Sequence, residues 1–161
     1  MSFLRIITRL RAFSAVVMLA VVTCSTQPAY SSESDNADLL GTWKLTRVLD
    51  SSEISSIGDR EAARLVGKRL VIGENEISLD GETCPNPEFD RHVEQAAKYI
   101  REQAHAPVGR LGLQGDFVTV VDLACSQALL KGHKKMVIYW KGFFFDAVKQ
   151  SPSRPRQPAK N

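Results

Sequence analysis

The 161-residue sequence predicts a mainly β fold, a small antiparallel barrel with one or two helices. Short runs that alternate between apolar and polar residues recur along the chain, and turn residues separate them. Once a targeting segment at the N-terminus is removed, the remaining length suits one domain, expected over residues 39–149. The run at 39–49 is predicted to be the first strand, around which the rest is built.

Residues 1–31 have the features of a secretory signal peptide. A positive start is followed by a mostly apolar stretch over residues 12–22, too short to span a bilayer, and then by small residues suited to cleavage near Ser31. The positive start contains Arg5, Arg9 and Arg11. We therefore expect a periplasmic or secreted protein. The lipobox-like context of Cys24 leaves an alternative, a lipoprotein anchored through Cys24, and only then is a membrane partner expected.

The charge of the chain is unevenly distributed. Residues 32–161 carry 18 basic and 18 acidic residues, so their formal charge is zero. Residues 149–161 hold four basic residues and no acid, which leaves residues 32–148 mildly acidic. The overall pI of about 8.8 is thus no evidence for a nucleic-acid partner, and none is expected. Residues 32–38 are expected to form a flexible lead-in, and the proline-rich residues 150–161 a disordered basic tail.

The first strand is predicted from Gly41 to Leu49. Its two faces differ in polarity, with Trp43, Leu45 and Leu49 on one side and Thr42, Lys44 and Thr46 on the other. After it, Asp59 is predicted to cap a short helix over 60–66 in which Ala62, Leu65 and Val66 face the core, and Gly67 ends that helix.

Short strands are predicted next at 68–72 and 76–79. The dipeptide Asp80-Gly81 predicts a tight turn into a further strand at 82–84, which the prolines at 85 and 87 end.

A second helix is predicted at about 90–104. Phe89, Val93, Ala96 and Ile100 fall at spacings of four, three and four, which gives one apolar stripe, and Pro107 ends the pattern. We expect this helix to be an insertion within the barrel.

The last third is predicted to consist of strands at 110–114, 117–125, 135–140 and 143–149, with Lys141-Gly142 as a hairpin turn. Apolar groups on both faces of these strands predict a central position in the sheet.

The two cysteines outside the leader predict a disulfide between Cys84 and Cys125 if the protein is exported. The alternative is two separate buried thiols. Two cysteines alone give almost no support to a metal site, and no cofactor is expected.

Three features resemble the lipocalin-like barrels of the calycin group: Gly41-x-Trp43 at the start of the first strand, the run of short antiparallel strands, and the terminal strand from Gly142 to Phe145. The resemblance implies a lipocalin-like barrel whose floor is packed by Gly41, Trp43, Phe143 and Phe145. The family commonly lays an arginine across the tryptophan, and here the matching position is Lys149 or Lys141. Its main helix follows the barrel, whereas here a helix is predicted in mid-chain.

No set of residues predicts an enzyme. There is no Gly-x-Ser-x-Gly or Ser-x-x-Lys motif, and the histidines His92, His105 and His133 lack metal-ligand spacing, so we expect them at the surface. Glu74 and Glu76 flank a turn. A hydrolase using Asp122 and Asp146 remains a minor alternative, which requires the two carboxylates to meet in a cavity.

The sequence favours a non-enzymatic binding protein of the bacterial envelope. Aromatic residues are concentrated in the predicted strands, so a small apolar ligand inside the barrel is one candidate. Its expected interior contacts are Arg47, Phe117, Tyr139 and Trp140. Alternatively, the rings simply fill the interior. The other candidate is a protein-interaction module, such as an inhibitor of an envelope enzyme, that binds through loops at 50–58, 84–90 and 129–134.

Overall fold

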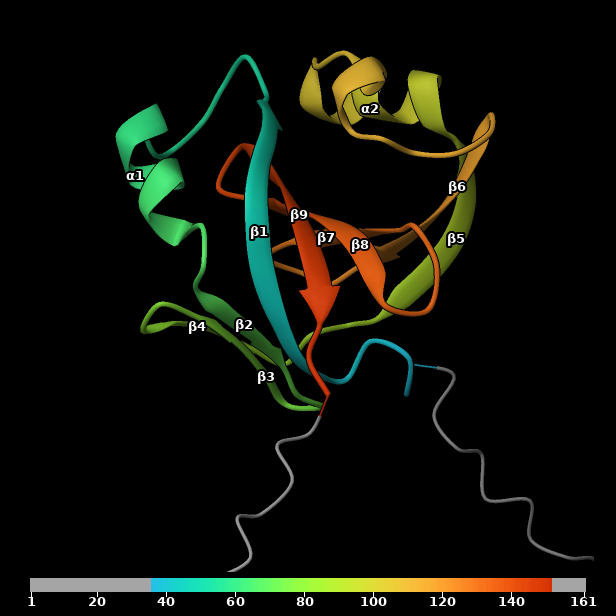
Figure 1. Ribbon diagram of the computed structural model, residues 1–161. Helices are drawn as coiled ribbons and strands as arrows, with labels where there is room; N and C mark the ends of the chain where they lie inside the picture. The colour runs from blue at the N-terminus through green and yellow to red at the C-terminus, as the bar shows by residue number, and fades with distance from the viewer. Residues whose placement is uncertain (1–35, 152–161) are drawn as a thin grey trace, which may run out of the picture. The chain divides into compact units, whose positions relative to one another are not determined.

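The computed structural model describes residues 36–151, which form a curled antiparallel sheet with two α-helices and one 3₁₀ turn (Figure 1). The mainly β fold class is confirmed. The elements are β1 (Gly41–Ser51), α1 (Asp59–Leu65), β2 (Arg69–Ile72), β3 (Glu76–Leu79), β4 (Glu82–Pro85), β5 (Asp90–Gln95), α2 (Ala96–Ala104), η1 (Val108–Arg110), β6 (Phe117–Asp122), β7 (Gln127–Leu130), β8 (Lys135–Trp140) and β9 (Phe143–Lys149).

The nine strands follow the order β4-β3-β2-β1-β9-β8-β7-β6-β5, and every neighbouring pair is antiparallel. Strand β1 lies in the interior of the sheet, where it pairs with both β2 and β9. Register shifts between Leu45 and Arg47 and between Val48 and Asp50 interrupt its pairing with β9. Such bulges bend a strand and increase its twist, which helps the sheet to curl into a half-barrel.

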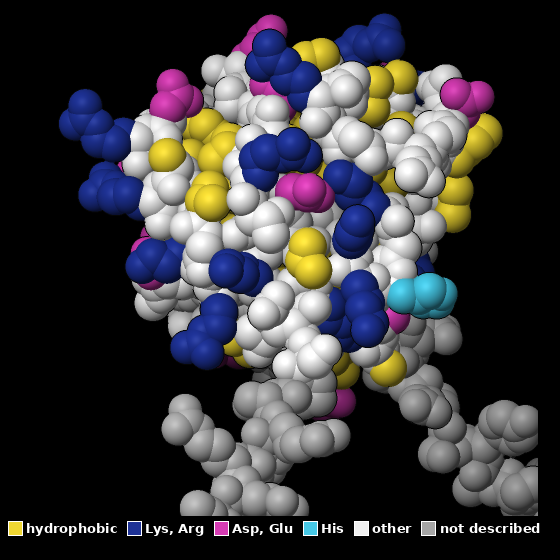
Figure 2. All heavy atoms as spheres, viewed as in Figure 1, with side chains coloured by type: hydrophobic (Ala, Val, Ile, Leu, Met, Phe, Trp, Pro, Cys, Tyr) yellow, Lys and Arg dark blue, Asp and Glu magenta, His cyan; other side chains and the backbone are white. Residues whose placement is uncertain are grey.

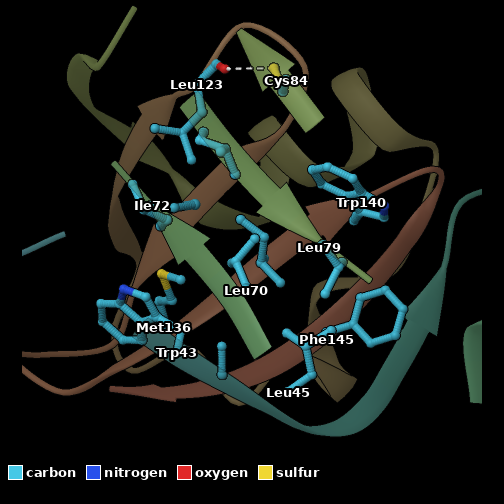
Figure 3. Close-up of a cluster of buried hydrophobic side chains, with 14 of the residues drawn as sticks. Trp43, Leu45, Leu70, Ile72, Leu79, Cys84, Leu123, Met136, Trp140 and Phe145 are labelled. Atoms are coloured by element: carbon cyan, nitrogen blue, oxygen red, sulfur yellow. Dashed lines mark hydrogen bonds between the residues drawn. The ribbon is translucent and has the colours of Figure 1, made fainter. Parts of the chain in front are cut away.

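The inner side of the curled sheet is filled by the larger of two hydrophobic clusters. Apolar side chains from β1, β2 and β3 meet those from β6, β8 and β9 there, and α1 adds the buried Ala62 (Figure 3). Trp43, Leu45, Leu70 and Phe145 are each at most 1% exposed. Burial of this apolar surface is the main stabilising contribution to the fold.

The outer side of β6–β9 carries the second cluster. Helix α2 places Ala96, Ile100 and Ala104 against the sheet, and the segment after it adds Leu111, so the parts of these strands beneath the cluster are covered on both faces. In those parts β8 and β9 are apolar on both faces, as the sequence pattern predicts, whereas Lys135 at the start of β8 is exposed.

The Cys84–Cys125 disulfide is present, with a Cα–Cα distance of 6.2 Å. Cys84 lies on the edge strand β4, whereas Cys125 lies in the connection between β6 and β7, near the opposite edge of the sheet. The bond therefore joins two parts of the sheet that strand pairing leaves far apart. Arg91 lies on β5, the other edge strand, and its guanidinium forms a salt bridge of 2.7 Å with Asp38, which precedes β1. This salt bridge is a second link between distant parts of the sheet.

The predicted helix at 90–104 is wrong in its first half. Residues 90–95 form β5, which pairs with β6 over its full length, and only residues 96–104 are helical. Val93, assigned by its spacing to the apolar face of a helix, is 65% exposed on this edge strand. Pairing with a strand more than twenty residues away overrides the local helical period.

Three further predictions are corrected. Residues 110–114 are not a strand, because η1 and an irregular segment occupy that region. Residues 127–130, placed partly in a loop, form β7 between β6 and β8. Helix α1 begins at Asp59 with Gly58 as its N-cap, and Val66 is 38% exposed rather than in the core.

The predicted signal peptide, Cys24 and most of the basic tail lie outside the described residues. Residues 36–39, which include the end of the predicted lead-in, form a turn. Neither α-helix within residues 36–151 has the length and apolar character needed to cross a membrane.

Candidate functional site

Trp43 is held at the start of β1 by Leu39 and Lys149. Its Nε1 donates a hydrogen bond of 2.8 Å to the carbonyl of Leu39, and its side chain is buried. The ammonium of Lys149 lies 5.5 Å from the ring centroid and also donates to the carbonyls of Ala37 and Asp38. Of the two lysines that could match the family's arginine, the structure therefore places Lys149 over the indole, as a cation–π contact.

The two phenylalanines expected beside Trp43 lie further along the same strand pair. Lys149 is the β9 partner of Trp43, while Phe145 is opposite Val48 and Phe143 is opposite Ser51. All three rings belong to the inner cluster, but Trp43 and Phe145 lie in separate parts of it (Figure 3). The strand register therefore separates Trp43 from Phe143 and Phe145 along β1 and β9, although Trp43 is buried beside the last strand as expected.

The four predicted interior contacts do not line one cavity. Trp140 is buried in the inner cluster, whereas Tyr139 packs on the outer cluster and donates a hydrogen bond to Ser52 Oγ. Phe117 is 66% exposed at the start of β6, and Arg47 points outwards to Asp146. The bulge after Leu45 explains the outward position of Arg47, which simple alternation assigned to the apolar face.

The two aspartates of the hydrolase alternative are not brought together. Asp122 is on β6 and Asp146 is on β9, with β7 and β8 between them. Asp146 pairs with Lys131 at 2.9 Å, and Asp122 accepts a hydrogen bond of 2.9 Å from the amide of Ala124. The two carboxylates therefore do not meet, as the hydrolase alternative requires.

The histidines are also separate. His133 is exposed in the β7–β8 turn, His105 follows α2 in a left-handed conformation, and His92 lies on β5. Among residues 36–151, no three His, Cys, Asp or Glu side chains are grouped to hold a metal ion.

A polar hollow lies beside α2, between that helix and β5–β7. We call it the α2 cleft. It has a volume of about 360 Å³ and is lined by His92, Glu94, Lys98, Tyr99, Glu102, Gln103, Asp122 and Gln127. A second hollow of about 210 Å³ shares three of these residues and extends to Cys125 and Tyr139. The cleft thus adjoins the disulfide.

Acidic groups dominate the α2 cleft. Burial raises the pKa of Tyr99, and the nearby carboxylates of Asp122 and Glu94 raise it further. The ring of His92 meets that of Tyr99 edge-on at 5.9 Å, and its Nε2 lies 4.0 Å from Glu94. With three acids and one lysine, the cleft is suited to a basic or hydrogen-bond-donating group.

Sequence reasoning missed this cleft because it assigned residues 90–95 to a helix. On a strand, His92 and Glu94 are two positions apart and so point to the same side. The spacing of His92 and Glu94 is therefore the signal in the sequence that could have predicted this side of the cleft. The opposing residues Tyr99 and Asp122 come from α2 and β6, and only the tertiary fold brings them near.

These observations define a class of protein, a mainly β half-barrel closed by a disulfide, with a filled interior and a polar outer cleft. No protein-family model, curated protein sequence or solved structure matches the chain.

Proposed function

We propose that this chain is an exported, non-enzymatic binding protein that engages a protein partner at the α2 cleft. The filled interior of the half-barrel is the observation that carries this proposal. It favours the protein-interaction alternative over a small apolar ligand held inside.

The interior offers little room for a ligand because large side chains occupy it. Trp43, Phe145, Leu70 and Ile72 are all at most 1% exposed within the inner cluster. Protein interiors pack as densely as organic crystals, and a ligand of drug size needs a pocket of several hundred Å³. Binding at the outer surface is therefore favoured.

The disulfide supports export. Disulfides persist in oxidising compartments and are rare in the reducing cytosol. Together with the leader-like residues 1–31, the bond favours a periplasmic or secreted location, with an anchor at Cys24 as the alternative. The lipocalin-like resemblance remains a proposal, compatible with the curled antiparallel sheet and with the Gly41-x-Trp43 start.

The chemistry of the cleft favours a partner that presents a lysine or arginine. Glu94, Glu102 and Asp122 offer carboxylate acceptors, and Tyr99 supplies an aromatic edge beside them. Charge-assisted hydrogen bonds to such acceptors are roughly twice as strong as neutral ones. An inhibitor of an envelope enzyme would fit this chemistry if the enzyme carries an exposed basic side chain.

Site-specific photo-crosslinking of the full-length, exported chain tests the partner. A photoreactive phenylalanine at Gln103, which lines the cleft but is not one of its acids, should give one discrete crosslinked protein in the native host. The same group at Ile54, which is 83% exposed and outside the cleft, should not. If Gln103 gives no discrete product, or if both positions give the same one, the proposed site is wrong.

An apolar probe tests the interior separately. Benzene should not bind the wild-type protein but should bind Leu70→Ala, because a cavity lined by apolar groups stays dry and accepts small aromatics. Benzene binding equally well to both proteins would show that a natural cavity exists, and would revive the small-ligand hypothesis.

A further inference from the structure

We propose that the outer face of β2 and β1, together with the parts of β9 and β8 that the second cluster leaves uncovered, docks on an anionic lipid surface. This face lies outside the α2 cleft, so the inference goes beyond the proposed function and does not depend on it. We call it the basic face. It is defined by a row of four residues that lie directly opposite one another across the four strands, namely Arg69, Lys44, Val148 and Lys135.

Strand register fixes this row. Arg69 is the partner of Lys44, Lys44 is the partner of Val148, and Val148 is the partner of Lys135. Residues directly opposite in an antiparallel sheet point to the same side. The three basic side chains are all exposed, while their strand neighbours Leu45, Leu70 and Met136 are buried on the inner side. The row therefore projects three cations from one surface.

This arrangement is unfavourable for folding. Like charges directly opposite one another, such as Arg69 and Lys44, destabilise a sheet. A sheet surface that only needs solubility is better served by alternating charges. The opposed positions of Arg69 and Lys44 therefore favour an external anionic partner that compensates the repulsion between their charges.

The acids near the row are already paired with other cations. Asp146 is bound by Lys131 at 2.9 Å and lies 3.6 Å from Arg47, and Asp80 pairs with Lys68 at 2.9 Å. Within residues 36–151, none of the three cations in the row has a salt bridge of its own. Their charges are thus available to a partner.

The composition of the face favours a lipid surface over a protein. Protein interfaces are anchored by a few Trp, Tyr and Arg residues in well-packed pockets. The basic face instead spreads lysines over a sheet, with an exposed Val71 and a half-buried Val148 among them. Figure 2 shows Lys and Arg side chains gathered around a small acidic area over β1 and β9. Such diffuse charge suits a layer of lipid phosphates.

The sequence that follows β9 is also basic. Strand β9 ends at Lys149, beside the row, and the sequence then adds Arg154, Arg156 and Lys160 without an acid. Because residues 32–161 have no net charge, attraction to an anionic surface must come from local patches. Such patches act within about a Debye length of the surface, about 8 Å at physiological salt.

Vesicle sedimentation of the full-length, exported protein tests this inference. The protein should bind vesicles of equal parts phosphatidylglycerol and phosphatidylcholine, should not bind phosphatidylcholine alone, and should dissociate at high salt. The double variant Lys44→Gln/Lys135→Gln should weaken binding about 25-fold, at about fivefold for each charge removed. The matched control Arg60→Gln/Arg101→Gln removes two exposed charges from α1 and α2 and should bind as the wild type does.

Two results would overturn the inference. Failure to bind the anionic vesicles excludes a lipid partner, even if the protein binds a soluble polyanion or another protein. Equal losses in the two double variants, or no loss in either, show that the basic face does not carry the binding. Circular dichroism of both variants checks that the fold is intact, and substitutions at these exposed positions should preserve it.

Discussion

At the scale of single residues, Trp43 combines burial with a specific hydrogen bond. It is 1% exposed and donates to the Leu39 carbonyl, which would be left without that donor if the indole were removed. We predict that Trp43→Ala lowers the free energy of unfolding by about 3–5 kcal/mol. The control Phe117→Ala removes a ring that is 66% exposed and should change it by less than about 0.5 kcal/mol. Urea unfolding compares the two, and similar losses would contradict the packing described.

Tyr99 gives a prediction for pH dependence. Its pKa is raised, first by burial and then by Asp122 and Glu94, so the folded protein holds the phenolic proton at a pH where the unfolded chain releases it. The resulting contribution to stability is fully present below the unfolded pKa of about 10 and is lost as the pH rises through the folded pKa.

A near-ultraviolet absorbance titration measures the ionisation of the tyrosines. Subtracting the curve of Tyr99→Phe from that of the wild type isolates the Tyr99 phenol. The difference curve should have its midpoint above the ordinary tyrosine value. Asp122→Asn should lower that midpoint only in part, because burial is the larger cause. A midpoint at or below the ordinary value would contradict the account of the α2 cleft.

At the scale of elements, two hairpin turns have nearly the same backbone but different surroundings. Asp80-Gly81 has φ values of 52° and 89°, and Lys141-Gly142 has 51° and 87°, as in type I′ turns. A Cβ on Gly81 would meet nothing within 4 Å, whereas a Cβ on Gly142 would lie 2.5 Å from the Cα of Ser55. The loop after β1 therefore packs directly on the second turn.

We predict that Gly81→Ala costs about 1–2 kcal/mol, from the left-handed backbone alone. Gly142→Ala should cost about 1–3 kcal/mol more, because the loop at Ser55 must move. Thermal unfolding of the two variants measures the difference. Equal costs would mean that the loop does not rest on the turn.

Strands that end in clear turn signals could be predicted from the sequence. The pairs β3–β4 and β8–β9 have two-residue turns with glycine, and their bounds agree with the pattern except that β4 extends through Pro85. Segments whose structure depends on distant partners could not be predicted. Residues 90–95 fit a helical period, but β6 offers them a full strand pairing, and the four residues of β7 are too few to show a period.

The candidate site could be predicted even less well than the fold. Its members come from β5, α2, β6 and β7. Two of these four elements, β5 and β7, are not predicted as strands by the sequence pattern. The predicted ligand contacts do not share one face, because a bulge turns Arg47 outwards and because Tyr139 and Trp140 alternate between the two faces of β8. Alternation along a strand shows that two residues face opposite ways, but not which face encloses a cavity.

At the scale of the whole molecule, the Cys84–Cys125 bond joins the edge strand β4 to the β6–β7 connection. The loop between the two cysteines spans 41 positions and contains β5 and α2. We predict that Cys84→Ala/Cys125→Ala lowers the free energy of unfolding by about 4 kcal/mol in the chain-entropy model. Reduced wild-type protein should be similarly destabilised. If the double variant and the reduced wild type each lost well below 1 kcal/mol in free energy of unfolding, the disulfide would contribute little to stability.

The proposed binding at the outer surface depends on a half-barrel that is filled by its own side chains. Native mass spectrometry of the full-length protein, exported and purified from the periplasm without delipidation, tests the filled interior most directly. We expect the mass of the processed chain with its disulfide intact and with no small apolar molecule bound. A stoichiometric apolar adduct that is lost on unfolding would contradict it.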